Sequence, residues 1–590
     1  MIIESTHMQV LKVWAPFAET LQILISGHAT PLEKASGDWW HTFDPVAPET
    51  EYLLAVNNNE PVPDPRSPWQ PGGIHGPSRT LDHKAFEWSD DYFQPAPLSS
   101  AVIYELHVGT FSEHGTFDGV TAHLDHLVDL GVTHVEVMPV NGFSGSRGWG
   151  YDGVNLFAPH EAYGGPYGFK RLVDACHSRG LAVILDVVYN HLGPAGNYLD
   201  HFGPYFTARY RSPWGMAVNL DGHGSHEVRR FFCDNAAMWM RDYHVDGLRI
   251  DAVHTLVDMS AVNFMEELTQ TAEQVQAETG RHKVLIAESD LNDPRVVRSR
   301  TSGGYGMDAQ WSDDFHHALH AVLTGEQNGY YADFGTLTDL ARALSRVFVY
   351  DNRFSAFRQR FHGKPVHDLS GHRFLGYLQT HDQVGNRALG ERLSHLVGHD
   401  RFKAAAAIML LSPFVPMLFQ AEEWAAETPF LYFTDHEDPE LGVAVKKGRC
   451  EEFGSFGWDP EKIPDPQARE TFDRCVLNWD ERDKPPHADI FDWYRQLIAL
   501  RKTLPEATDG RMDRVEAAAD DTAGWLVMTR GRLVVACNLA DHKQFVPVSG
   551  ADKTDLQICS AENPQINDRG IELPGNCAAV LYKKPGTREE

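Results

Sequence analysis

The sequence feature that most constrains the fold is an alternation of short apolar segments with amphipathic helical patterns, which starts near residue 101. Eight of these apolar segments have the length and composition of buried strands. They are 101–111, 133–140, 181–190, 245–254, 282–289, 305–311, 373–382 and 416–424. Eight β–α repeats favour an enlarged (β/α)8 (TIM) barrel over an open doubly wound sheet. No GxGxxG or GxxxxGK[ST] motif follows the first strand, which disfavours a nucleotide-binding fold.

Apolar residues at helical spacing predict the helices between these strands. One helix is expected to carry Val120, Leu124, Leu127 and Val128, and another Phe169, Leu172, Val173 and Cys176. Gly131 and Gly180 lie where C-terminal caps of these helices belong. A last amphipathic helix at 491–502 is expected to close the barrel.

The two ends of the chain have the period-two alternation of strands. This pattern occupies 11–16, 20–26 and 51–58, and returns at 524–530, 532–540 and 577–584. A Pro- and Gly-rich linker covers 61–78, and a loop rich in Gly, Pro and aromatic residues covers 191–225. We therefore expect an N-terminal β-sandwich at 1–95, the barrel at 96–505 with a loop subdomain at about 191–225, and a C-terminal β-sandwich at 506–590.

Composition excludes several classes of partner. The chain has 52 Lys and Arg against 82 Asp and Glu, a net charge of −30, which disfavours nucleic acids and anionic membranes. Seven scattered Cys without a CxxC motif indicate neither a disulfide framework nor a zinc site. No apolar run has membrane-spanning length, and residues 1–10 lack the pattern of a signal peptide. We expect a cytoplasmic monomer that binds no metal or cofactor and acts on a neutral partner.

Polar residues gather at the downstream ends of the predicted barrel strands, where active sites of such barrels form. They are Asp186, Arg249, Asp251, Glu288, His381 and Asp382. Arg249 and Asp251 are two residues apart on one strand, so their side chains share a face. Crowding keeps one carboxyl protonated while a nearby Arg keeps another ionised, and glycoside hydrolysis needs that pair. A single Asp–Arg pair is more often structural, but four carboxylates at equivalent strand ends favour an active site.

These residues lie in motifs that resemble the four signature regions of the α-amylase superfamily, glycoside hydrolase family 13, in order and spacing. The motifs are DVVYNH (186–191), DGLRIDAVH (246–254), LIAESD (285–290) and THD (380–382). The resemblance implies that Asp251 is the nucleophile and Glu288 the general acid/base. It also implies that Asp382 holds sugar hydroxyls and stabilises the transition state.

The same resemblance implies a set of substrate-binding residues. Arg249 would orient Asp251, and Asp186 and Asn190 would support the site. Tyr151, in WGYDG (149–153), would stack beneath the sugar. The residues expected to bind substrate are Tyr151, Asp152, His191, Arg249, His254 and His381.

The resemblance narrows to one branch of the superfamily. The VWAP motif, the linker at 61–78 and YELHVGTF (104–111) resemble a group that includes branching enzymes and maltooligosyltrehalose trehalohydrolases. Segments 193–207, 347–365 and 428–449 resemble the trehalohydrolases specifically. Two departures are Ala421, where a Gly is expected before Glu422 and Glu423, and Leu248, where Phe is common.

The implied reaction is hydrolysis of the α-1,4 bond next to the terminal trehalose of maltooligosyltrehalose, so the expected partners are this substrate and related α-1,4-glucans. Retention of configuration follows if Asp251 and Glu288 lie about 5–5.5 Å apart. Segments 347–365 and 428–449 are the candidates for selecting trehalose. The N-terminal domain resembles the immunoglobulin-like modules attached to glucan-active enzymes, and at most one of Trp39 and Trp40 is expected to face outward.

Three alternatives remain open at the level of sequence. A branching enzyme shares the fold and the first half-reaction but transfers the glucan to a sugar hydroxyl. A carbohydrate-binding protein without turnover would retain the barrel, although all three catalytic carboxylates are present. A metalloenzyme is the third, because the chain has 31 His, although it has no HExxH motif.

Overall fold

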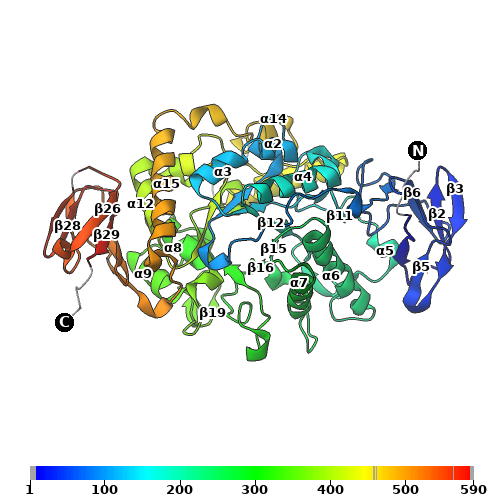
Figure 1. Ribbon diagram of the computed structural model, residues 1–590, viewed down its shortest axis with the longest axis horizontal. Coiled ribbons are helices and arrows are strands. Elements are labelled where there is room, and N and C mark those ends of the chain that lie inside the picture. Colours follow the sequence, from blue (N-terminus) through cyan, green and yellow to red (C-terminus); the bar gives the residue numbers. More distant parts are fainter. Residues whose placement is uncertain (1–7, 456–458, 460–461, 563, 585–590) are drawn as a thin grey trace.

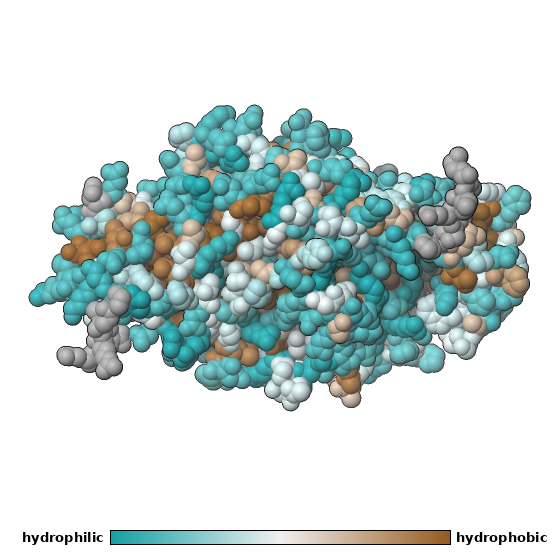
Figure 2. Space-filling model, in the orientation of Figure 1, coloured by the Kyte–Doolittle hydropathy of each residue, from teal (hydrophilic) through white to brown (hydrophobic). Residues whose placement is uncertain are grey.

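The computed structural model describes residues 8–455, 459, 462–562 and 564–584. Figure 1 shows an elongated molecule with a barrel in the middle, the N-terminal strands at one end and the C-terminal strands at the other. Figure 2 shows a largely hydrophilic face with smaller patches of hydrophobic residues, some near the two ends and others over the middle of the molecule. In the described part of the chain, no helix combines the length and the apolar character needed to cross a membrane.

Eight parallel strands form a closed barrel, and each of the eight predicted segments contributes one strand. The strands are β8 (Ile103–Leu106), β9 (His134–Val137), β12 (Ala182–Val187), β15 (Gly247–Ile250), β16 (Val284–Ala287), β17 (Ala309–Trp311), β20 (Phe374–Tyr377) and β21 (Val415–Phe419). Their spatial order follows the chain, and β21 pairs with β8 to close the ring. The predicted (β/α)8 barrel is therefore confirmed.

Alternate residues of these strands fill the inside of the barrel. Ile103, Ile184, Ile286, Trp311 and Tyr377 belong to one buried cluster there. Because side chains alternate along a strand, the residue two positions further on projects toward the carboxyl-terminal mouth from the same face. The apolar interior therefore supports a layer of polar side chains above it.

Helices surround the barrel (Figure 1). The longer ones are α4 (Gly165–Ser178), α6 (Ser225–Asp242), α7 (Phe264–Thr279), α8 (Asp313–Thr324), α9 (Leu337–Arg346), α12 (His399–Leu410) and α15 (His487–Thr503). Helix α13 (Pro439–Ser455) lies in a long loop after β21. Shorter helices are α1 (Val108–Phe111), α2 (Phe117–Thr121), α3 (Leu124–Leu130), α5 (Leu199–Phe202), α10 (His381–Gly385), α11 (Leu393–Val397) and α14 (Arg469–Asp473).

The single helix predicted to carry Val120, Leu124, Leu127 and Val128 is wrong, because this part of the chain forms two short helices, α2 and α3. The break falls at Ala122 and His123, and it turns α3 so that Leu124, Leu127 and Leu130 are buried. Val128, expected in the core, is consequently 44% exposed. Gly131 ends α3 with φ of 98°, a left-handed conformation that glycine adopts without strain.

The N-terminal strands form two small sheets, ordered β3–β2–β6–β7 and β1–β5–β4. Their bounds are β1 (Lys12–Trp14), β2 (Leu21–Ile25), β3 (His28–Pro31), β4 (Glu33–Lys34), β5 (Trp39–His41), β6 (Glu51–Val56) and β7 (Ser78–Arg79). Trp40 is buried and donates a hydrogen bond to the carbonyl of Ala15, whereas Trp39 is half-buried. The expectation that only one of the two faces outward is confirmed.

The C-terminal strands also form two sheets, ordered β22–β23–β24–β29–β26 and β25–β28–β27. Their bounds are β22 (Val515–Asp520), β23 (Trp525–Arg530), β24 (Leu533–Asn538), β25 (Gln544–Pro547), β26 (Thr554–Cys559), β27 (Gln565–Asn567), β28 (Gly570–Leu573) and β29 (Cys577–Lys583). A separate buried cluster fills the space between these sheets.

Three strand pairs lie outside these sheets. The loop after β12 contains α5 and a hairpin of β13 (Phe206–Ser212) and β14 (Gly215–Val218). The others are β10 (Asn141–Gly142) with β11 (Asn155–Pro159), and β18 (Arg353–Ser355) with β19 (Arg360–His362). Trp214, at the turn of the β13–β14 hairpin, is 50% exposed.

Candidate active site

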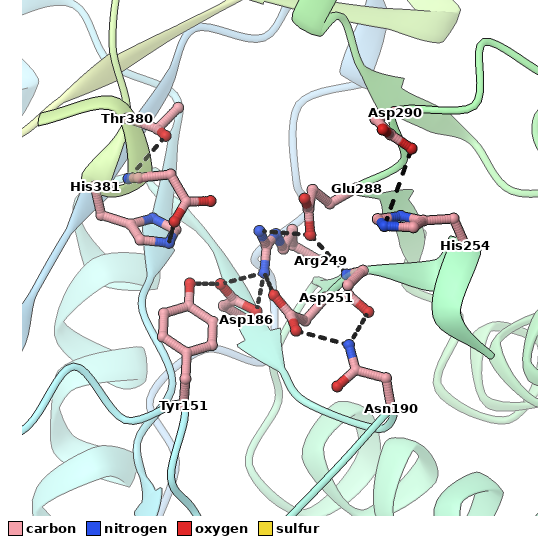
Figure 3. Close-up of polar contacts among 12 residues, drawn as sticks. Tyr151, Asp186, Asn190, Arg249, Asp251, His254, Glu288, Asp290, Thr380 and His381 are labelled. Atoms are coloured by element: carbon pink, nitrogen blue, oxygen red, sulfur yellow. Dashed lines mark hydrogen bonds and ion pairs between the residues drawn. The ribbon is translucent and has the colours of Figure 1, made fainter. Parts of the chain in front are cut away.

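The carboxyl ends of the barrel strands bring the predicted catalytic residues to one mouth. Arg249 lies in β15, Asp251 and Glu288 follow β15 and β16, and Asp382 lies in α10, after β20 (Figure 3). The side chains of Asp251, Glu288 and Asp382 are 10%, 18% and 39% exposed, whereas that of Arg249 is fully buried. The three carboxylates are therefore reachable from the mouth, and the guanidinium supports them from below.

Arg249 connects most of the charges in this layer. Its Nη1 donates to both oxygens of Asp186, each at 2.9 Å, and to Oδ1 of Asp251 at 2.7 Å. Its Nη2 lies 3.2 Å from Oε2 of Glu288. The guanidinium packs 4.4 Å from the ring of Trp311, which fixes its plane.

Asp251 is held in its ionised form. Burial alone would raise its pKa, but the charge of Arg249 and a 2.7 Å hydrogen bond from Nδ2 of Asn190 hold the pKa below the ordinary value. Asn190 also donates to the backbone carbonyl of Asp251, which fixes the carboxylate's orientation. A carboxylate that is ionised and held in one position is suited to attack a carbon atom.

Glu288 is in the opposite protonation state at neutral pH. The pKa of Glu288 is raised to about 8, mainly by burial. The charges of Asp251 and Asp382 also raise this pKa, whereas the charge of Arg249 lowers it. The backbone N–H of Ala252 donates to Oε2 of Glu288 at 2.6 Å. Ala252 has φ of 38°, an uncommon conformation for alanine that aims this N–H at the carboxyl group.

His381 forms the other wall of the mouth. Its Nδ1 lies 2.5 Å from Oε1 of Glu105 in β8, and its Nε2 lies 3.6 Å from Oδ1 of Asp382. Burial alone would lower the pKa of His381, but the charges of Glu105 and Asp382 outweigh it and raise the pKa to about 9. Tyr151 stacks on the His381 ring at 5.1 Å and donates its hydroxyl hydrogen to Asp186 at 2.6 Å.

Asp152 and His191 lie beside this centre and line a cavity of about 510 Å³. The ring of His191 stacks on that of Trp214 at 4.2 Å, and its Nδ1 contacts Oδ1 of Asn190. Tyr432 and His436, both from the segment 428–449, line the same cavity. The loop after β12 and the loop after β21 therefore form its walls together.

His254 lies on the other side of the centre. Its Nε2 is 4.0 Å from Oδ1 of Asp290, whose Oδ2 accepts a 3.0 Å hydrogen bond from Arg358. Figure 3 shows His254 and Asp290 beyond Glu288, across the site from Tyr151. Arg358 belongs to the segment 347–365, so this segment contacts Asp290 beside His254, whereas segment 428–449 contributes to the cavity with Asp152 and His191.

The described residues contain no group of three or more His, Cys, Asp or Glu arranged to hold a metal ion. An ionised carboxylate, a protonated carboxyl group and a protonated imidazole around one opening are the components of acid–base and nucleophilic catalysis at an acetal carbon.

Comparison with known proteins agrees with this geometry. Residues 86–211 match the family model of the alpha-amylase catalytic domain. The chain is 49% identical to the malto-oligosyltrehalose trehalohydrolase of Arthrobacter ramosus, over 96% of this chain and 98% of that protein. The chain belongs to the malto-oligosyltrehalose trehalohydrolase family. It is therefore a glycoside hydrolase of the alpha-amylase class.

Two further comparisons concern more distant relatives of this chain. The crystal structure of a putative alpha amylase from Salmonella typhimurium superposes with a TM-score of 0.89 at 34% identity, covering 97% of each chain. A 1,4-alpha-glucan branching enzyme of Vibrio parahaemolyticus is 30% identical over only 52% of this chain and 46% of its own length. The resemblance to branching enzymes is thus confined to part of the molecule.

The two departures from the family pattern lie away from the trehalohydrolase centre. Ala421 is buried with φ of 64°, so alanine here adopts the left-handed conformation that a glycine would favour. Leu248 is fully buried in β15, and it alternates with the inward-facing Arg249.

Sequence reasoning did not select two residues that shape the centre. Glu105 holds His381, and Trp311 packs against Arg249. Glu105 lies in the middle of the predicted strand 101–111, and Trp311 is the last residue of the predicted strand 305–311. Alternation of side chains along these strands was the available signal for them.

Proposed function

We propose that the protein hydrolyses the α-1,4 bond next to the terminal trehalose of maltooligosyltrehalose and releases trehalose and a maltooligosaccharide. The observation that carries the reaction type is the pairing of an ionised Asp251 with a protonated Glu288 around Arg249. The substrate follows from the name of the full-length relative in Arthrobacter ramosus.

In the proposed first step, Glu288 donates its proton to the glycosidic oxygen while a carboxylate oxygen of Asp251 attacks the anomeric carbon. The bond between that carbon and the glycosidic oxygen breaks, trehalose departs, and a glycosyl ester forms on Asp251. Arg249 and Asn190 hold Asp251 for this attack, since each bonds a different carboxylate oxygen.

In the proposed second step, the Glu288 carboxylate takes a proton from water, and the resulting hydroxide attacks the same carbon. The ester bond breaks and Asp251 is regenerated. Two displacements at one carbon retain its configuration, which requires a carboxyl separation of about 5–5.5 Å. Positive charge develops on the sugar in both steps, and we assign Asp382 to its stabilisation.

We assign His381 and Tyr151 to the sugar whose bond is cleaved. The protonated His381 places an N–H donor at Nε2, and Tyr151 offers a ring face beside it. Glu105 keeps His381 protonated, and Asp186 holds the Tyr151 hydroxyl. Both carboxylates are therefore positioning residues.

We assign the two sides of the centre to the two parts of the substrate. The acid must lie beside the leaving oxygen, so trehalose departs on the side of Glu288, where His254, Asp290 and Arg358 lie. The cavity bounded by Asp152 and Trp214 then receives the glucan chain. Segment 428–449 is accordingly assigned to the glucan and segment 347–365 to trehalose.

Three earlier expectations belong to this proposal. We propose that the domain limits fall near residues 95 and 505, and that the protein acts as a monomer in the cytoplasm. The net charge of −30 supports a neutral glucan as partner over an anionic polymer.

A product assay with two substrates tests the proposed function. Maltopentaosyl-trehalose and maltoheptaose, which has the same number of sugars, are incubated with the enzyme and the products are separated by chromatography. Release of trehalose from the first, with slower cleavage of the second, is expected. New α-1,6 branches on amylose would instead establish a branching enzyme, and binding without any product would establish a carbohydrate-binding protein.

Asp251→Asn serves as the matched control, because it keeps the side chain's shape while removing the nucleophile. Proton NMR of the first-formed reducing end should show the α anomer. Appearance of the β anomer would refute the double displacement.

A further inference from the structure

A carboxylate for which the proposed mechanism has no role lies just beyond strand β17. Ala309 and Trp311 face the inside of the barrel, and Asp313, two residues beyond Trp311, is the first residue of α8. In the sheet, Gln310 pairs with Ala287, and Trp311 pairs with Leu375. This register places Asp313 at the mouth, between the strand that precedes Glu288 and the strand that precedes Asp382.

A single strong contact holds Asp313 in place. Tyr377 in β20 donates its hydroxyl hydrogen to Oδ1 of Asp313 at 2.5 Å. Tyr377 is itself fully buried and packs against the rings of Trp311 and His316, so the donor cannot move freely. Within the described part of the chain, Oδ2 of Asp313 accepts no hydrogen bond, and the residue is only half-buried.

The neighbouring Asp314 shows what a structural carboxylate looks like at this point of the fold. Its Oδ2 accepts hydrogen bonds from the backbone N–H groups of Val349 and Tyr350, both at 2.7 Å, and the residue is buried. Asp314 thereby ties α8 to the segment that follows α9. Asp313 has no such backbone partner, so anchoring the chain does not account for it.

We propose that Asp313 is a further substrate-binding residue, which accepts hydrogen bonds from hydroxyl groups of the departing sugar beside Glu288. The inference rests on the proposed function. A half-buried carboxylate with one oxygen anchored and the other without a hydrogen bond is suited in its ionised form to bind neutral sugar hydroxyls, because a hydrogen bond to a charged acceptor is stronger than one to a neutral group.

The electrostatic surroundings are consistent with this position. The pKa of Asp313 is raised to about 7, mainly by burial and also by the charges of Asp290, Asp314 and Asp382, whereas the hydrogen bond from Tyr377 lowers it. Its negative charge in turn raises the pKa of Glu288, and it also raises the pKa of Tyr330 in the segment after α8, where burial is the larger cause. Loss of the charge should therefore move the basic limb of the pH profile of kcat/KM to lower pH.

The test compares two substrates with the same glucan chain and different leaving groups. Maltotriosyl-trehalose has a departing sugar, whereas α-maltotriosyl fluoride loses a fluoride ion that carries no hydroxyl groups. Asp313→Asn should lower kcat/KM for the first at least about tenfold and for the second no more than about twofold. Tyr377→Phe, which frees the carboxylate, should shift the same ratio in the same direction by a smaller factor.

Asp400→Asn is the matched control, since it removes the same charge from an exposed position in the first turn of α12. This control variant should have the same ratio of kcat/KM between the two substrates as the wild type. The basic limb of its pH profile should also be unchanged. Equal losses on both substrates with Asp313→Asn would show a structural role, and no loss on either would show that Asp313 contacts no sugar. Either result overturns the proposal.

Failure of the proposed function has a different signature. A wild-type enzyme that hydrolyses the fluoride but releases no trehalose from maltotriosyl-trehalose would contradict the proposed substrate. Maltohexaose would then replace maltotriosyl-trehalose as the substrate with a departing sugar. The loss of kcat/KM in Asp313→Asn on maltohexaose, compared with its loss on the fluoride, would decide the role of Asp313.

Discussion

The proposed charge of His381 can be tested by removing the carboxylate that sustains it. Glu105→Gln keeps the shape of the side chain but removes a charge 2.5 Å from Nδ1 of His381. Both side chains are 1% exposed, so water cannot replace the lost interaction. We expect His381 to lose its proton near neutral pH, and with it the N–H donor at Nε2.

The magnitude follows from the position of the pKa. Holding the pKa of His381 at about 9 rather than 6.5 corresponds to about 3 kcal/mol in favour of the protonated ring. A ring with the ordinary pKa of 6.5 is protonated in about a quarter of the molecules at pH 7, and burial reduces that fraction. The value of kcat/KM at pH 7 should therefore fall at least about fourfold in Glu105→Gln.

The assay is the pH dependence of kcat/KM for trehalose release, from pH 5 to 8. Relative to the wild type at the same pH, the Glu105→Gln variant should regain activity as the pH falls and His381 becomes protonated. The free energy of unfolding supplies a second readout. Because the folded-state pKa of His381 is raised, its stabilising contribution is complete below about pH 6.5 and is lost as the pH rises through about 9.

Glu136→Gln is the matched control for this experiment. Glu136 pairs with Glu105 in the sheet register, and burial together with the charges of Glu105 and Asp186 raises its pKa well above the ordinary value. Burial and these charges favour the neutral form of this carboxyl group, so its replacement should change kcat/KM less than Glu105→Gln does. A Glu105→Gln variant with wild-type kcat/KM and no gain at low pH would refute the reasoning, as would equal damage from Glu136→Gln.

Three further predictions concern other parts of the molecule. Because Glu288 must be protonated to act as the acid and its pKa is about 8, kcat/KM should fall as the pH rises through about 8, and a profile constant to pH 9.5 would contradict this assignment. Trp214→Ala should raise KM about tenfold and change kcat little, because the ring lines the glucan cavity and stacks on His191; a loss confined to kcat would argue against it. His177→Gln should lower the free energy of unfolding by about 1.5–3 kcal/mol in urea denaturation, since it removes the charge-assisted hydrogen bonds to the buried Asp90 and Asp246, which keep Arg281 and Lys283 as their other cationic neighbours. Burial lowers the pKa of His177 but these carboxylates raise it overall, so its contribution should be lost at high rather than low pH, and equal stability of the variant at pH 6 would contradict the argument.

The barrel was predictable because its strands are buried on both faces. Such strands are short apolar runs, and their periodic recurrence with helices between them has few structural solutions. The strand ends were less predictable. Residues 108–111 have strand-like composition but form α1, because the chain leaves the sheet after Leu106 and must turn at the barrel mouth.

The site was predictable only where one strand determines the geometry. Arg249 and Asp251 share a face because they are two residues apart, and that rule holds in any strand. Glu105 and His381 are 276 residues apart, and only closure of the ring brings β8 near the loop after β20. Contacts of this kind depend on strand order and stagger, which local patterns do not contain.

The protonation states of the carboxyl groups are the part of the chemistry furthest from the sequence. Asp251 and Glu288 are both carboxylic acids at equivalent strand ends, and nothing in their residue types separates an acid from a nucleophile. Asp251 accepts hydrogen bonds from both Arg249 and Asn190, whereas Glu288 meets one backbone N–H and the more distant Nη2 of Arg249. The hydrogen bonds from Arg249 and Asn190 lower the pKa of Asp251, whereas burial outweighs the weaker contact with Arg249 and raises the pKa of Glu288. Function in this barrel therefore depends on how one guanidinium is shared among its neighbours.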